Sequence, residues 1–201
     1  MLIDPASLPW RDAYKLMIGS ILPRPIAWVS TVSKEGVFNL APFSFFTVVA
    51  AEPMTICFSP MRHTNGSKKD TLINIEETGE FVVNIVSEPL AEAMNQTSAA
   101  LAPEVDEFQV AGLTPVPSES VQVPRVGESL VAYECRLLRV VHVGEAKAGA
   151  GALVLGTVQR MYVADEVLDQ GRIRTDVLQP IGRMAGNDYT RCTDRFAIER
   201  P

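Results

Sequence analysis

The residues best suited to binding an anion lie in one basic segment, residues 62–71. The segment combines four potential cations with hydroxyl side chains and a glycine, in a chain whose formal net charge is −6. A helix is expected to begin near its end, and the free N–H groups and positive dipole of a helix start attract anions. The basic segment therefore predicts a phosphate site, although the same residues also suit a solvated loop with an ordinary helix cap. The segment reads Arg62-His63-Thr64-Asn65-Gly66-Ser67-Lys68-Lys69-Asp70-Thr71.

A second segment, Pro42-Phe43-Ser44-Phe45-Phe46-Thr47, suits contact with a flat aromatic ligand. In a continuous strand, alternation puts Ser44 and Phe46 on one face and Phe43, Phe45 and Thr47 on the other. If one face joins the core, the other offers an apolar wall with hydroxyl groups beside it. The alternative is a half-buried strand packed on a helix.

Short strands joined by tight links are expected to position both segments. Apolar and β-branched residues dominate six stretches, which is typical of strands. Two further stretches have the spacing of helices, and Ser67-x-x-Asp70 resembles a capping box at the first of them. Strands are expected at 26–32, 37–50, 54–59, 81–86, 130–143 and 153–164, and helices at 72–77, ending at 78–79, and at 89–96.

These elements predict a mainly β protein with short helices, in a single domain covering 1–201. The first three strands are expected to form an antiparallel meander, with Pro42 at a bulge or an edge. Antiparallel sheets of six or more strands commonly close into a barrel. The strand–helix alternation and G-x-G-x-x-G motif of a Rossmann domain are missing. Residues 98–120 are interpreted as a surface excursion, and 165–201 as an irregular C-terminal segment.

Composition excludes several classes of protein. An acidic balance of 18 Lys and Arg against 24 Asp and Glu does not suit general nucleic-acid binding. The chain has no run of about 18 apolar residues for a membrane span, and its N-terminus lacks a secretory signal. Three scattered cysteines and two distant histidines do not suit a disulfide framework or a metal site. The sequence therefore predicts a cytoplasmic protein without nucleic-acid or membrane partners.

Several motifs occur in an order typical of one known family. From about residue 13 to 191, the chain resembles the flavin reductase-like proteins. These are antiparallel, Greek-key-like split β-barrels that bind FMN, and they include flavoredoxin and the reductase components of two-component monooxygenases. The motifs are Pro23-Arg24-Pro25-Ile26-Ala27-Trp28-Val29-Ser30-Thr31, Gly36-x-x-Asn39-Leu40-Ala41-Pro42-Phe43-Ser44-Phe45-Phe46, Phe58-Ser59-Pro60, Lys69-Asp70-Thr71-Leu72-Ile73-Asn74-Ile75, Gly79-Glu80-Phe81-Val82-Val83-Asn84 and Pro180-Ile181-Gly182-Arg183-Met184-x-Gly186-x-x-Tyr189.

The resemblance implies FMN as cofactor, with FAD as an alternative, and NAD(P)H as co-substrate. It implies a homodimer with FMN near the subunit interface, and a monooxygenase or another redox protein as partner. The smaller reductases of the family have Asn-Ser-Phe-Thr where this chain has Ser44-Phe45-Phe46-Thr47, so their nicotinamide contacts do not transfer directly.

The resemblance also implies three groups of cofactor-binding residues. They are Thr31, Asn39, Ser44 and Phe45 along the ring and ribityl chain; Ser59, Arg62, Lys68, Lys69 and Thr71 around the phosphate; and Arg24, Trp28 and Tyr189 near the ring or the dimer partner.

Three functions remain open on this basis. The first is a reductase in which a nicotinamide gives hydride to flavin N5, a reaction that requires no catalytic side chain. The second is a flavoredoxin-like electron carrier that holds FMN tightly and reduces a partner protein. The third is a non-redox barrel that binds another anionic ligand in the same place.

Overall fold

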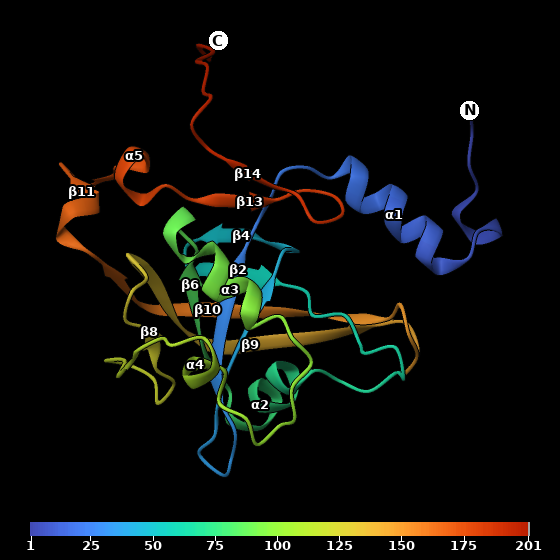
Figure 1. Ribbon diagram of the computed structural model, residues 1–201, viewed down its shortest axis with the longest axis horizontal. Coiled ribbons are helices and arrows are strands. Elements are labelled where there is room, and N and C mark those ends of the chain that lie inside the picture. The colour runs from blue at the N-terminus through green and yellow to red at the C-terminus, as the bar shows by residue number, and fades with distance from the viewer. Residues whose placement is uncertain (201) are drawn as a thin grey trace.

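The computed structural model describes residues 1–200, and its centre is one seven-stranded antiparallel sheet. The strand order is β3-β2-β6-β9-β10-β5-β4, and β9 and β10 form a long hairpin that crosses the molecule (Figure 1). Five of the six expected strands are confirmed to within a few residues. The strands are β2 (Ala27–Val32), β3 (Phe38–Phe43), β4 (Phe46–Ala51), β5 (Met54–Phe58), β6 (Glu80–Ile85), β9 (Val131–Val143) and β10 (Gly151–Val163).

The sixth expected strand, 37–50, is wrong, because the chain bends at Ser44 and Phe45. The halves β3 and β4 do not pair: β3 lies at one end of the strand order and β4 at the other. Three Cα steps separate Phe43 from Phe46, which span at most about 11 Å, so the two edges must meet there. The sheet thus curves into a barrel that is split between β3 and β4, and the first three expected strands do not form a simple meander. The predicted alternation is also wrong, since Phe43 and Phe46 both pack against the same core.

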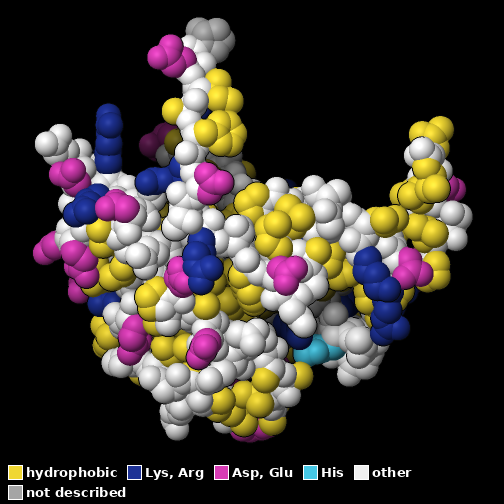
Figure 2. All heavy atoms as spheres, turned by 45° about the horizontal axis from the view of Figure 1, so that its top comes forward, with side chains coloured by type: hydrophobic (Ala, Val, Ile, Leu, Met, Phe, Trp, Pro, Cys, Tyr) yellow, Lys and Arg dark blue, Asp and Glu magenta, His cyan; other side chains and the backbone are white. Residues whose placement is uncertain are grey.

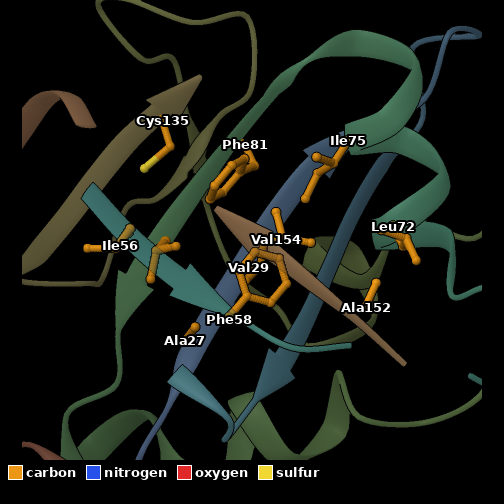
Figure 3. Packing of buried hydrophobic residues seen from close by; sticks show 11 residues of the cluster. Ala27, Val29, Ile56, Phe58, Leu72, Ile75, Phe81, Cys135, Ala152 and Val154 are labelled. Carbon is orange, nitrogen blue, oxygen red and sulfur yellow. The ribbon is translucent and has the colours of Figure 1, made fainter. Parts of the chain in front are cut away.

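Two aromatic rings, those of Phe58 and Phe81, lie among aliphatic side chains in the barrel interior (Figure 3). The ring centroids of Phe58 and Phe81 are 5.6 Å apart, in an edge-to-face arrangement, and Phe43 lies 5.1 Å from Phe58. Gly156 on β10 makes room for Phe81, because a Cβ atom at that position would lie 2.2 Å from Phe81 Cζ. Burial of these rings, together with the aliphatic side chains around them, stabilises the barrel.

Helix α2 (Asp70–Thr78) packs Leu72 and Ile75 against this core and ends at Gly79, whose φ of 73° is left-handed. Its predicted capping box is wrong. The N-cap residue is Lys69, which makes no side-chain cap, and the Ser67 hydroxyl instead donates to Asn65 Oδ1 at 2.7 Å. No side chain therefore caps the first N–H groups of α2.

A second core on the other face of the sheet includes the fully buried side chains of Trp28 and Phe108. Phe108 belongs to 98–120, so the interpretation of that segment as a surface excursion is wrong in part. Its short helix is held in place because the core takes up Phe108 and Leu113. The helical elements here are η2 (Glu88–Leu90), α3 (Ala91–Gln96), which confirms the expected second helix, and α4 (Glu107–Val110).

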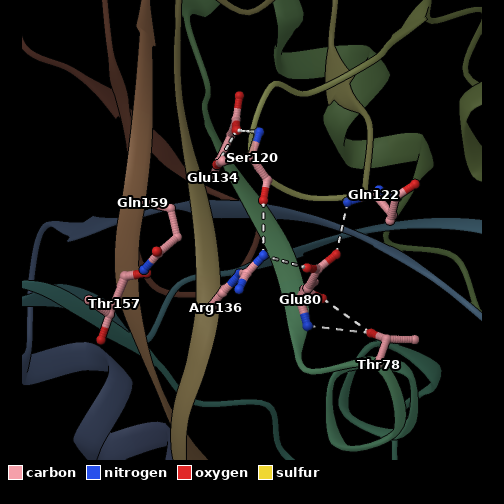
Figure 4. A network of polar contacts seen from close by, with 8 residues as sticks. All are labelled: Thr78, Glu80, Ser120, Gln122, Glu134, Arg136, Thr157 and Gln159. Carbon is pink, nitrogen blue, oxygen red and sulfur yellow. Dashed lines mark hydrogen bonds and ion pairs between the residues drawn. The ribbon is translucent and has the colours of Figure 1, made fainter.

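The loop after α4 carries β7 (Pro115–Val116) and β8 (Arg125–Val126). Two carboxylates on the sheet, those of Glu134 and Glu80, accept hydrogen bonds that hold this loop in place (Figure 4). Glu134 accepts hydrogen bonds from the N–H of Glu119 at 3.0 Å and from the N–H of Ser120 at 2.6 Å. Burial raises the pKa of Glu134, but these bonds and the Ser120 hydroxyl outweigh it and lower the pKa below its ordinary value. Glu80 accepts from the N–H of Gln122 at 2.8 Å.

The C-terminal segment is more regular than expected, because two of its strands extend an N-terminal strand into a small sheet. A three-stranded sheet has the order β1-β13-β14, in which Arg24 is the register partner of Arg183. Its strands are β1 (Arg24–Pro25), β13 (Ile181–Arg183) and β14 (Tyr189–Arg191). Before it come η3 (Asp165–Val167), β11 (Leu168–Asp169), β12 (Arg172–Ile173) and α5 (Thr175–Leu178).

Both ends of the chain project from the body as arms with exposed apolar side chains (Figures 1 and 2). The N-terminal arm contains η1 (Pro5–Ser7) and α1 (Trp10–Ser20), and α1 has no buried residue. Within residues 1–200, none of the helices combines the length and the apolar character that a membrane crossing requires.

Candidate functional site

A cleft opens where the two edges of the barrel meet. Five parts of the chain line it: α1, the end of β3 with its following bend, the loop after β5, the start of α2, and residues 97–107. The bend is anchored from two sides, because the N–H of Ser59 donates to Phe45 O at 2.8 Å and Arg24 Nε donates to Ser44 Oγ at 3.3 Å. The bend between β3 and β4, where the two edges of the barrel approach each other, therefore fixes the position of the cleft.

One end of the cleft is cationic. Arg62 and Lys69 line it beside the uncapped start of α2, and among residues 1–200 neither has a carboxylate oxygen within 4 Å. Burial lowers the pKa of Lys69, while Asp70 raises it. His63 also lines this end, and burial and the Lys69 charge lower its pKa, although Asp70 opposes the shift. Asp70 lines the cleft beside these groups and offsets part of their charge, and an anion would pair with the positive charge that remains.

A buried hydrogen-bond network forms the floor of the cleft. Thr71 Oγ1 donates to Asn39 Oδ1 at 3.0 Å, and Asn39 Nδ2 donates to Glu107 Oε2 at 3.2 Å. The N–H of Leu40 donates to the same carboxylate oxygen at 3.1 Å. Burial raises the pKa of Glu107, although these bonds oppose the shift. The network joins α2, β3 and α4, so the polar floor is held in one arrangement.

The other end of the cleft is aromatic. The rings of Tyr14 and Phe45 have centroids 6.4 Å apart with an interplanar angle of 59°. Pro42 and Ser44 line the cleft beside them. An apolar wall with two hydroxyl groups, those of Tyr14 and Ser44, suits the edge of a planar ring system.

The structure brings seven of the twelve predicted cofactor-binding residues together around this cleft. They are Asn39, Ser44, Phe45, Ser59, Arg62, Lys69 and Thr71. The other five lie outside its lining.

Each of those five has another partner in the structure. Thr31 lies beneath the floor, where its Oγ1 accepts a hydrogen bond from Asn74 Nδ2 at 3.0 Å. Lys68 pairs with Glu76, and Trp28 is buried with its Nε1 donating to Thr97 Oγ1 at 2.9 Å. Arg24 supports Ser44 from behind, and Tyr189 lines a smaller neighbouring pocket.

Three features of the cleft were not predicted from the sequence: Tyr14, Glu107 and residues 97–101. Tyr14 belongs to α1, a helix that was not predicted from the sequence. Residues 97–101 show no hydrophobic periodicity that would predict a helix or a strand. The sequence holds one indication of the helix that carries Glu107. Asp106 is a typical N-cap residue, and in the structure it caps α4 by accepting a hydrogen bond from the N–H of Phe108 at 2.9 Å. A cap beside a buried aromatic residue is typical of a short packed helix.

Comparison with known proteins agrees with this geometry. Residues 18–178 match the family model described as the flavin reductase like domain. An uncharacterized protein of Halalkalibacterium halodurans is 45% identical over 203 residues, covering 100% of this chain and 97% of that protein.

Two solved structures are similar over almost the whole chain. Nitrilotriacetate monooxygenase component B from Bacillus cereus is 42% identical, covers 98% of both chains and has a TM-score of 0.94. The 2-nitrobenzoate 2-nitroreductase NbaA of Pseudomonas fluorescens is 33% identical, covers 100% of this chain and 96% of its own, and has a TM-score of 0.89. The predicted mainly β, antiparallel split barrel is confirmed, and the chain belongs to the flavin reductase-like domain family.

Proposed function

We propose that the cleft binds FMN and that the protein is a reductase, which uses the flavin to pass electrons from NAD(P)H to a second acceptor. The observation that carries the proposal is one continuous cleft with a cationic end, a polar floor and an aromatic end. FMN has the same sequence of chemistry along its length: a phosphate, a polyhydroxyl chain and a tricyclic ring. Membership of the flavin reductase-like family supports the same ligand.

The residues present fit each part of that ligand. Arg62, Lys69 and the uncapped N–H groups at the start of α2 would hold the phosphate, because they provide positive charge and donors together. Asn39 and Glu107 would face the polyhydroxyl chain. Phe45 would pack against the ring.

FMN held in this cleft would supply the redox chemistry, the acceptance of hydride from a reduced nicotinamide and the transfer of electrons to an acceptor. The chain's own contribution is positioning and a hydrogen-bond donor. Ser44 Oγ already accepts from Arg24 Nε, so its hydroxyl hydrogen is free to point into the cleft. A donor held by a buried cation would stabilise negative charge at the ring edge.

The proposal extends to assembly, partner and location. We expect a homodimer, a monooxygenase or another redox protein as acceptor, and a cytoplasmic location. The name of the Bacillus cereus relative, a monooxygenase component, supports the choice of partner. Sedimentation equilibrium tests the assembly, and a dimer would have twice the chain mass of 21.9 kDa.

The first experiment is an absorption spectrum of the purified protein with equimolar FMN, before and after anaerobic NADH or NADPH. A reductase would bind the flavin and lose its visible absorption band when the preferred nicotinamide is added. Retention of oxidised FMN through dialysis, with no response to either nicotinamide, would favour the electron carrier. Failure to bind FMN at all would leave the non-redox barrel.

A further inference from the structure

A second, smaller pocket adjoins the cleft and shares three of its residues: Pro42, Ser44 and Ser98. Its remaining wall comes from the C-terminal sheet, through Arg183 and Tyr189, and from α3. Tyr189 Oη donates to Asn95 Oδ1 at 3.4 Å, which ties that sheet to α3. The pocket therefore lies next to the aromatic end of the cleft rather than to its cationic end.

Arg183 gives this pocket a positive charge that no acidic group offsets. Its guanidinium carbon lies 4.5 Å from the centroid of the Tyr189 ring, and its Nη2 donates to Gly186 O at 2.5 Å. Among residues 1–200, no carboxylate oxygen lies within 4 Å of it. A guanidinium has five N–H donors in a planar fork, so donors of Arg183 remain for a ligand.

The neighbouring arginine does not compete for that role. Arg24, the register partner of Arg183, directs its Nη1 and Nη2 groups to backbone carbonyls at the end of α1 and at Met184. Two guanidinium groups thus lie side by side, one committed to the fold and one half-exposed at a pocket. Two like charges without an acidic partner favour an anion.

We infer that the Arg183–Tyr189 pocket binds an anionic group of the second reactant, the molecule that exchanges electrons with the flavin. A carboxylate or phosphate would pair with the guanidinium fork. The planar, conjugated body attached to it would lie along Pro42 toward Ser44, where the two pockets join. This inference rests on the proposed function, and it assigns the reactant's class: an organic anion with a conjugated ring.

Isothermal titration of the FMN-loaded protein with two probes tests the inference. Benzoate represents a carboxylic acid substrate, and NAD⁺ represents a nicotinamide dinucleotide with a phosphate anion that does not reduce the flavin. Arg183→Gln should weaken at least one probe about tenfold, the effect of losing one charge-assisted pair. Arg183→Lys should fall in between, because it keeps the charge but loses the fork. If only benzoate loses affinity, the pocket binds the carboxylate of an acid substrate. If only NAD⁺ loses affinity, the pocket binds the phosphate of a nicotinamide dinucleotide.

Arg125→Gln is the matched control, since Arg125 stacks on Tyr162 with its guanidinium carbon 3.7 Å from the ring centroid and lines neither pocket. The inference is overturned if neither probe loses affinity in Arg183→Gln, if Arg125→Gln loses as much, or if the native protein binds neither probe. Thermal melting checks that each variant is folded. FMN titrations of the same proteins, and benzoate titrations without FMN, separate failure of this pocket from failure of the proposed function.

Discussion

Arg24 Nε donates a hydrogen bond to Ser44 Oγ at 3.3 Å, from a side chain that does not itself line the cleft. The same guanidinium donates to Ile18 O at 2.7 Å and to Ile21 O at 3.0 Å, at the end of α1, and to Met184 O at 2.9 Å. One buried arginine therefore joins the N-terminal helix, the bend at the cleft and the segment after β13.

Replacing Arg24 should weaken both the fold and the site. Arg24→Met would leave three carbonyl groups and the Ser44 hydroxyl without their donor, and we expect the free energy of unfolding to fall by about 2–4 kcal/mol. Urea denaturation measures this, and Arg24→Lys should recover only part of the loss because an ammonium cannot reach all four acceptors. An unchanged urea midpoint in Arg24→Met would show that these bonds do not hold the segments together.

Lys69 and Lys68 are adjacent in the sequence, but only Lys69 lines the cleft. Lys69→Gln should weaken FMN binding by about 1.5–3 kcal/mol, because a charged contact with the phosphate is lost. Lys68 pairs with Glu76, so Lys68→Gln should leave FMN affinity unchanged. Fluorescence titration of FMN with both variants decides the point, and equal losses would place the phosphate elsewhere.

Adding bulk at Ser44 should block the site without unfolding the protein. Ser44 lies in both pockets and is half-buried, so an indole there would fill the space proposed for the ring. We expect Ser44→Trp to lose FMN binding and to remain folded, with a free energy of unfolding lower by about 1–3 kcal/mol because Arg24 Nε loses its acceptor. Ser44→Ala keeps the space and should lose only about 0.5–1.5 kcal/mol of affinity. Normal FMN binding by Ser44→Trp would contradict the placement of the ring.

Two buried glutamates should make opposite contributions to the dependence of stability on pH. Burial raises the pKa of Glu107, so the folded state holds its proton to higher pH than the unfolded state does. The native protein should therefore lose stability relative to Glu107→Gln as the pH rises from the ordinary glutamate pKa to the raised one.

Glu134 provides the matched comparison, since hydrogen bonds outweigh burial and lower its pKa. The native protein should lose stability relative to Glu134→Gln as the pH falls from the ordinary glutamate pKa to the lowered one. Urea midpoints of the three proteins between pH 3 and 8, a range chosen around the glutamate pKa, test both signs. The same sign for both variants would refute the assignment.

Gly156 should not tolerate a methyl group. An added Cβ would lie 2.2 Å from Cζ of the fully buried Phe81, and overpacking of this kind costs about 1–3 kcal/mol. Gly156→Ala should lower the melting temperature, and combining it with Phe81→Leu should cost less than the sum of the two single changes. Additive losses would show that the two positions do not compete for the same space.

The sequence predicted most strands because each carries its own local signal. The long hairpin of β9 and β10 and the end of α2 at Gly79 follow from apolar patterning and a left-handed glycine. The bend at Ser44 and Phe45 was missed, because Phe43–Phe46 looks like one continuous strand and only pairing with different partners separates its halves.

The residues of the cleft also fall into a predicted group and a group that the sequence did not reveal. The residues that line it and were predicted belong to contiguous motifs, such as Lys69-Asp70-Thr71. Lys68 directly precedes that motif, but its side chain pairs with Glu76 on α2 and does not line the cleft. Glu107 and Tyr14 reach the cleft only through tertiary packing, which a local pattern does not reveal.

The seam between β3 and β4 has a consequence for the order of events in folding. The strands that bring its two edges together join residues far apart in the chain, as in the pairing of β6 with β9 and of β5 with β10. Such non-local contacts form slowly. Because the bend that carries Ser44 and Phe45 links the two ends of the strand order, we expect it to take its final shape late in folding. Flavin binding should therefore recover in the last kinetic phase of refolding. Its rate of recovery would report how fast the two edges of the barrel come together.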